Sequence, residues 1–215
     1  MANSVNVLDV LSVACAAYRI NGNEVLRESK DNKIANGVLV KAHYLDNKKI
    51  EVTDEDCLQA QEVKDYISQR VMLFKLTGSP VSDFVQNIFE LVEKDTVHLH
   101  KLGLLVWAPK VKADLVKVDD QRQELSVLSF GSQYLGKVGD KIETEFVAVT
   151  ERWTTAYNCY RYTGHDNKGN LIGFLTGNKL SKLDGVKIKG RIKTIENGRF
   201  TGGKTTYLNY VKEIK

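Results

Sequence analysis

The chain has 215 residues, of which 42% are hydrophobic and 27% charged, with a formal net charge of +4. These values are typical of a globular protein with one large domain or two small ones, and they exclude a disordered chain. The three cysteines are widely spaced and no apolar run reaches the ~18 residues of a membrane helix, so we expect a cytoplasmic protein without a disulfide framework or a membrane partner.

The first 129 residues are predicted to form a mainly helical domain. Apolar residues recur at helical spacing near the N-terminus, and the stretch from 21 to 51 leaves its structure open. Thr53 precedes an acidic first turn and Ser82 precedes an amphipathic run, so each is expected to begin a helix. A short helix is expected over residues 97–105, and Pro109 either starts or breaks an element.

Residues 130–215 are predicted to form a nucleic-acid-binding domain. Helical periodicity is replaced by short β-rich runs between turn residues. Five strands are expected, over residues 141–150, 157–163, 171–176, 186–195 and 205–211. We therefore predict an α+β protein in which the helical region is followed by a five-stranded antiparallel OB-type β-barrel.

The charge is distributed unevenly between the two parts. From Phe130 onward 15 Lys and Arg residues stand against 8 Asp and Glu residues, whereas the first 129 residues carry 16 basic and 19 acidic ones. Within the fourth predicted strand, basic residues alternate with apolar or small ones from Val186 to Lys193. This alternation predicts one core face and one basic face, which either binds a phosphate backbone or is a solvated surface.

Aromatic residues are interleaved with this charge. Exposed rings stack on nucleic-acid bases, but in a barrel this small some rings belong to the core, and the sequence leaves open which ones. The candidate platforms are Trp153, Tyr160, Tyr162, Phe174 and Tyr207. The candidate phosphate contacts are Arg161, Lys179, Lys182, Lys187, Lys189, Arg191, Lys193, Arg199 and Lys204.

No pattern in the sequence predicts catalysis. Residues 198–205 match the GxxxxGKT pattern of a P-loop, but a P-loop requires a following helix, and the run after Thr205 is strand-like. His98 and His100 lack acidic or cysteine partners at metal-ligand spacing. We therefore expect a protein that is not an enzyme, with no catalytic residue, no metal and no cofactor.

Four short motifs carry a resemblance to a known family. They fall on Ser132, Tyr134, Gly136, Val138 and Gly139; on Asp166, Gly169 and Asn170; on Lys189, Gly190, Ile192 and Lys193; and on Thr206, Leu208 and Val211. With these motifs the C-terminal part resembles the OB domain of phage-encoded single-stranded-DNA-binding replication proteins. The resemblance implies binding of single-stranded DNA, in preference to RNA, during DNA replication or recombination in the host cytoplasm.

Two points stay open at this stage. Many replicative binders recruit other replication proteins through an acidic tail, whereas this sequence ends in VKEIK. Such partners would then contact the N-terminal domain, or else the protein is not a general binder that coats a genome. The alternative function is a protein-interaction module of a replication complex, in which the OB barrel is a scaffold.

Overall fold

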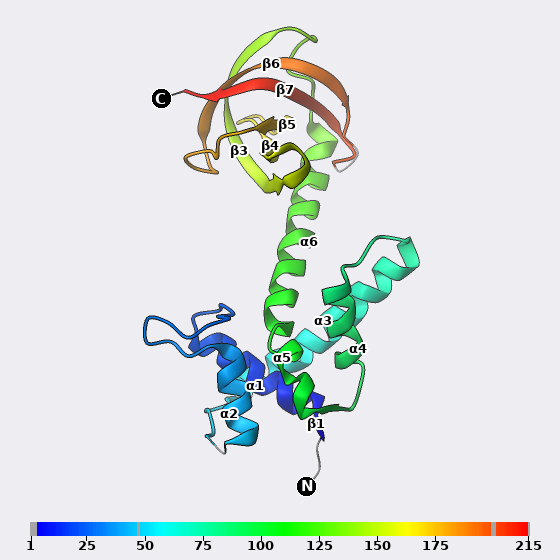
Figure 1. The fold of residues 1–215 in the computed structure, drawn as a ribbon. Helices are drawn as coiled ribbons and strands as arrows, with labels where there is room; N and C mark the ends of the chain where they lie inside the picture. The colour runs from blue at the N-terminus through cyan, green and yellow to red at the C-terminus, as the bar shows by residue number, and fades with distance from the viewer. Residues whose placement is uncertain (1–3, 47, 199–200, 215) are drawn as a thin grey trace. The chain divides into compact units, whose positions relative to one another are not determined.

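A computed structural model describes residues 4–46, 48–198 and 201–214. The chain divides into two compact units, one ending at Val116 and the other beginning at Lys117 (Figure 1). The division lies within helix α6 (Ala108–Gly131), as does the boundary that the sequence predicted at 129/130. It falls earlier because the second half of this helix packs on the strands that follow it.

The first unit is a helical bundle around α1. Val10, Leu11 and Ala14 of this helix have no exposed surface, and residues from α2 to α6 complete the same core. Two short strands, β1 and β2, pair antiparallel beside it. The elements are β1 (Ser4–Asn6), α1 (Val7–Ile20), α2 (Asn36–Leu45), α3 (Asp54–Thr77), α4 (Asp83–Val92), β2 (Thr96–His98), the 3₁₀ turn η1 (Leu99–Lys101) and α5 (Leu102–Leu105).

The predicted helix starts of this unit are confirmed. Thr53 forms a capping box with Asp56 at the start of α3, and the Ser82 hydroxyl accepts a hydrogen bond from the Val85 N–H at the start of α4. Pro109 is the second residue of α6, so it starts an element. The single helix predicted over 97–105 is wrong in part, because the segment begins as β2 and becomes helical at Leu99.

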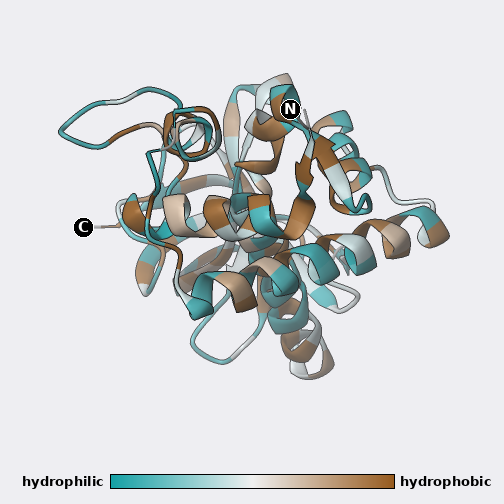
Figure 2. Cartoon of the chain, turned by 90° about the horizontal axis from the view of Figure 1, so that it is seen from below, coloured by the Kyte–Doolittle hydropathy of each residue, from teal (hydrophilic) through white to brown (hydrophobic). Residues whose placement is uncertain are grey.

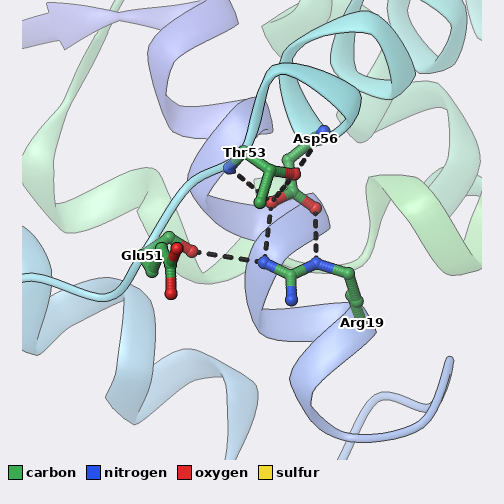
Figure 3. Close-up of polar contacts among 4 residues, drawn as sticks. All are labelled: Arg19, Glu51, Thr53 and Asp56. Atoms are coloured by element: carbon green, nitrogen blue, oxygen red, sulfur yellow. Dashed lines mark hydrogen bonds and ion pairs between the residues drawn. The ribbon is translucent and has the colours of Figure 1, made fainter.

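A buried carboxylate joins α1 to the start of α3 (Figure 3). Asp56 has no exposed side-chain surface, and Arg19 donates to it from Nε and Nη2 at 3.0 and 2.9 Å. The Thr53 N–H and hydroxyl also donate to Asp56. Burial acts to raise the pKa of Asp56, but the hydrogen bonds from Arg19 and Thr53 outweigh it, so the pKa lies below its ordinary value.

The second unit contains a closed barrel of five strands in the order β3-β4-β5-β7-β6 (Figure 1). Its neighbours are antiparallel except β5 and β7, which run parallel. The predicted wholly antiparallel barrel is therefore wrong, because directions cannot alternate all the way round a closed ring with an odd number of strands. The strands are β3 (Lys141–Thr154), β4 (Cys159–His165), β5 (Leu171–Thr176), β6 (Val186–Asn197) and β7 (Lys204–Glu213), with the 3₁₀ turn η2 (Thr155–Tyr157) after β3.

The barrel interior follows the period-two pattern of its strands. In β6, Val186, Ile188 and Ile192 are buried, whereas the four basic residues between and after them are exposed, as the sequence predicted. Strand β5 is buried from Leu171 to Phe174, so it is covered on both faces. The inner face meets the barrel core, and Leu171 on the outer face meets Leu125 of α6.

Polar contacts join the end of α6 to the barrel. The Ser132 hydroxyl accepts a hydrogen bond from the Leu171 N–H at 2.8 Å and donates to the Lys204 carbonyl oxygen. It thereby holds β5 and β7 where they run parallel. The buried Asp166 accepts hydrogen bonds from the Lys168 and Asn170 N–H groups and shapes the turn between β4 and β5.

Hydrophobic residues are mixed with hydrophilic ones along the helices (Figure 2). Within the described ranges, no helix has both the length and the apolar character that crossing a membrane requires.

We predict that Asp56→Asn lowers the free energy of unfolding by about 2 kcal/mol at pH 7, because the amide cannot accept all the hydrogen bonds of the carboxylate. Urea denaturation measures this change. Asp54→Asn, in the same helix turn but exposed, is the matched control and should have a much smaller effect.

The ion pair of Asp56 with Arg19 also makes the stability of the fold depend on pH. The pKa of Asp56 is lowered in the folded state. The contribution of its carboxylate to the free energy of unfolding is therefore complete above the pKa of an unfolded aspartate, ~4, and is lost as the pH falls through the folded value. The stability difference between the wild type and Asp56→Asn should therefore narrow below pH ~4. An equal difference at pH 7 and pH 3 would contradict this assignment.

Adding a side chain at Gly164 of β4 is expected to cause a severe steric clash. A Cβ at this position would lie 1.9 Å from the Val147 carbonyl oxygen, where β3 carries an irregularity. Gly164→Ala should therefore prevent β3 and β4 from pairing, with a loss of several kcal/mol or of folding of the barrel. Gly177→Ala, which meets open space, should be tolerated in the same urea denaturation.

Candidate nucleic-acid interface

A groove of about 380 Å³ crosses the outer face of β4, β5, β7 and β6. We call it the ring groove, because tyrosines line it together with two cations and one carboxylate. The tyrosines are Tyr157, Tyr162, Tyr207 and Tyr210, the cations are Arg161 and Lys193, and the carboxylate is that of Glu196. Uncharged side chains, among them Leu175, Thr194 and Asn209, fill the space between them.

Tyr207 forms the floor of the ring groove. Its register partner on β5 is Gly173, and a Cβ on Gly173 would lie 2.7 Å from the Tyr207 ring. The ring therefore packs closely against the strand, which a glycine at this position allows. Burial, followed by the charge of Glu196, raises the pKa of Tyr207, while the Arg161 charge opposes the rise, so Tyr207 is a neutral ring at physiological pH.

Asn209 brings an unsatisfied polar atom to the ring groove. Its side-chain oxygen is buried and accepts no hydrogen bond from any described residue. Such an atom costs about 1–3 kcal/mol relative to a hydrogen-bonded one.

Tyr210 reaches the groove because β7 carries a bulge. Between the pairs Arg191↔Asn209 and Lys189↔Lys212, β6 has one residue and β7 has two. Tyr210 has a φ of 52° there and is 78% exposed. Strict alternation after Leu208 would have turned its ring into the barrel core. Instead the bulge turns Val211 toward the core and the Tyr210 ring outward.

Tyr157 enters from the loop between β3 and β4. It ends η2, is 74% exposed, and is followed by Asn158 in the left-handed region. The sequence placed Tyr157 in a strand and did not select Tyr157, Asn209 or Tyr210 as site residues. A turn at Asn158 and a break of alternation in β7 produce their positions, and neither has a clear signal in the sequence.

Two of the predicted platforms are core residues. Tyr162 has no exposed surface and Phe174 is 4% exposed, so neither ring can stack on a base. The Tyr162 hydroxyl donates to Glu151 and accepts from the Leu180 N–H, and burial raises the pKa of Tyr162 to about 12. Both residues touch the ring groove only from beneath.

Trp153 and Tyr160 lie outside the lining of the ring groove. They face each other across β3 and β4, with ring centroids 4.8 Å apart and an edge-to-face arrangement. Trp153 is 48% exposed, and Tyr160 stacks on the buried Tyr162. Together with Tyr162 they form a row of aromatic rings from the surface to the core, so packing alone explains why these two positions are aromatic.

The predicted phosphate contacts are dispersed over the barrel surface. Arg161 and Lys193 line the ring groove, whereas Lys189 and Arg191 line another hollow of the surface. The others stand apart: Lys179 forms an ion pair with Glu151 at 3.0 Å, Lys182 is exposed before β6, Lys187 lies opposite Glu145, and Lys204 donates to the Gln133 side chain. Arg199 lies outside the described residues.

The P-loop pattern has no P-loop context. Strand β7 begins at Lys204, so no helix follows the glycine-rich segment. Over the described ranges, no three His, Cys, Asp or Glu side chains are grouped to hold a metal ion. The His98 and His100 rings stack on each other with centroids 5.5 Å apart.

Comparison of the chain with protein-family models, with curated proteins and with solved structures finds no match. The interpretation of the ring groove therefore rests on its own residues.

We predict that Gly173→Ala lifts the Tyr207 ring away from β5, because the new methyl group would occupy its place. The hydroxyl would then be better solvated, and the pKa of Tyr207 would fall toward the ordinary value of ~10. An NMR titration of tyrosine labelled at ¹³Cζ measures this change. Gly177→Ala is the control, and an unchanged Tyr207 titration in Gly173→Ala would refute the packing argument.

Proposed function

We propose that this protein is a non-enzymatic binder of single-stranded nucleic acid and that the ring groove is its binding site. The observation that carries the proposal is the combination, in one groove, of three tyrosine rings that are at least partly exposed with two cations, against the single carboxylate of Glu196. Rings stack on bases of any sequence, and cations attract the phosphate backbone. A surface with both features fits a single strand, whose bases are free to stack.

The barrel is proposed to be of the OB type. Five strands close into one barrel, a turn containing Tyr157 connects β3 to β4, and the consecutive strands β6 and β7 pair antiparallel. In OB barrels the face of the second and third strands, with the 1–2 and 4–5 loops, binds oligonucleotides. The second and third strands here are β4 and β5, and the ring groove crosses that face.

Each part of the ring groove has a distinct role in the proposed mechanism. Tyr157 and Tyr210 are the exposed rings on which bases stack, and the partly buried Tyr207 ring lies beside β5 in the same groove. Lys193 and Arg161 contact phosphates. Stacking dominates affinity here, so binding should depend little on base sequence.

The proposed cellular role is in DNA replication or recombination, including that of a bacteriophage, with DNA preferred to RNA. It rests on the resemblance of the C-terminal motifs to phage single-stranded-DNA-binding proteins. The role requires no cofactor, since stacking and charge neutralisation need no reaction.

Fluorescence anisotropy with a labelled oligo-dT of ~12 nucleotides tests the proposal. The double variant Tyr157→Ala/Tyr210→Ala should weaken binding by ~2 kcal/mol or more, about 30-fold in Kd, because two stacking platforms are lost. Matched RNA and duplex oligonucleotides show which nucleic acid is preferred.

Phe130→Ala is the matched control, because this ring is 89% exposed on α6 and is not among the groove residues. It should bind like the wild type. If the wild type does not bind oligo-dT at low salt, or if its affinity ignores salt between ~50 and ~200 mM, the proposed function is wrong.

A second candidate function concerns the helical unit, as a docking surface for replication proteins. It is favoured by Leu58, Met72 and Leu76 of α3, which are 69%, 57% and 80% exposed. The double tyrosine variant separates the two functions, since it should weaken nucleic-acid binding as above and leave binding of a protein partner intact.

A further inference from the structure

A second hollow of the barrel surface lies over β3, β6 and β7, with a volume of about 760 Å³. We call it the cation groove, because four cations line it against one carboxylate, that of Glu143. The cations are Lys141, Lys189, Arg191 and Lys212. By contrast, Arg161 and Lys193 are the cations of the ring groove.

Like charges stand directly opposite each other in this groove. Lys141 pairs with Arg191 across β3 and β6, and Lys189 pairs with Lys212 across β6 and β7. Directly opposed like charges destabilise a sheet. Among the residues that the structure describes, none of these four cations forms an ion pair or a side-chain hydrogen bond. Glu143, which stands opposite Lys189 on β3, offsets part of this repulsion, and a bound polyanion would relieve the rest.

Tyr210 joins the two grooves, since it lines both of them. The bulge of β7 that turns this ring outward lies beside Gly190 of β6. A Cβ on Gly190 would lie 3.1 Å from the Val211 Cγ2 and 3.3 Å from the Asn209 carbonyl oxygen. The glycine thus lets the bulged segment pack closely on β6. An exposed ring consequently stands where the stacking surface ends and the cationic surface begins.

We infer that one single strand occupies both grooves in succession. Its bases stack in the ring groove, the chain passes over Tyr210, and its phosphodiester backbone then follows the cations of the cation groove. This inference rests on the proposed function and extends it. It assigns the second groove to phosphate contacts on a longer strand, which a short oligonucleotide held by the rings does not reach.

The test compares two lengths of labelled oligo-dT, ~4 and ~12 nucleotides, which bracket the shorter site sizes of OB barrels. The variant is Lys189→Gln/Lys212→Gln, measured by anisotropy between ~50 and ~200 mM salt. Each phosphate contact on a single strand contributes ~0.7 to the salt slope, so the slope for the longer strand should fall by about 1.4. Its affinity at low salt should fall about tenfold, while the shorter strand binds as to the wild type.

The control is Lys117→Gln/Lys168→Gln, which removes the same charge at exposed positions outside both grooves and off strand β6. It should keep the slope of the wild type, because distant exposed charges are screened at these salt concentrations. In urea without nucleic acid, Lys189→Gln/Lys212→Gln should be about as stable as the wild type, since the repulsion between Lys189 and Lys212 and the attraction of Lys189 to Glu143 are lost together.

Failure of the inference is distinguishable from failure of the proposed function. If the wild type binds both lengths and Lys189→Gln/Lys212→Gln leaves the slope of the longer strand unchanged, the strand does not enter the cation groove. An equal loss in the control pair also overturns the inference, because net charge alone would then explain it. If the wild type binds neither length, the proposed function fails and the inference fails with it.

Discussion

Closure of five strands into one hydrogen-bonded ring is the constraint on which both surface grooves depend. An odd ring requires one parallel pair of neighbours, and here it is β5 with β7. This pair places Gly173 beside Tyr207, so that the tyrosine ring packs closely on β5. It also brings β4, β5, β7 and β6 together in the order that forms the ring groove.

Local departures from regular strand geometry position the exposed rings. The bulge of β7 turns Tyr210 outward and returns Val211 to the core, and Gly190 gives the bulge room against β6. The left-handed Asn158 ends the turn that carries Tyr157. Bulges and turns thus supply the stacking surfaces, whereas regular strand positions supply the core.

Many residues that carry the resemblance to phage single-stranded-DNA-binding proteins have structural roles here. Ser132 bonds β5 to β7, and Asp166 with Asn170 shapes the turn between β4 and β5. Gly190 makes room for the bulge. These motifs therefore describe how the barrel is joined, and they say less about its ligand. Within them, Lys189 and Lys193 line grooves, which is why the functional proposal depends on the surface.

The sequence by itself determined the local features: the helix caps at Thr53 and Ser82, the five strands, and the exposed basic face of β6. Helix capping and period-two alternation depend on residues that are near neighbours in the chain, so they can be predicted from the sequence. Only the tertiary structure decided that Tyr162 belongs to the core while Tyr210 is exposed, and that Lys189 stands between Glu143 of β3 and Lys212 of β7. These outcomes depend on strand register, bulges and the parallel closure, which arise from contacts between residues far apart in the chain.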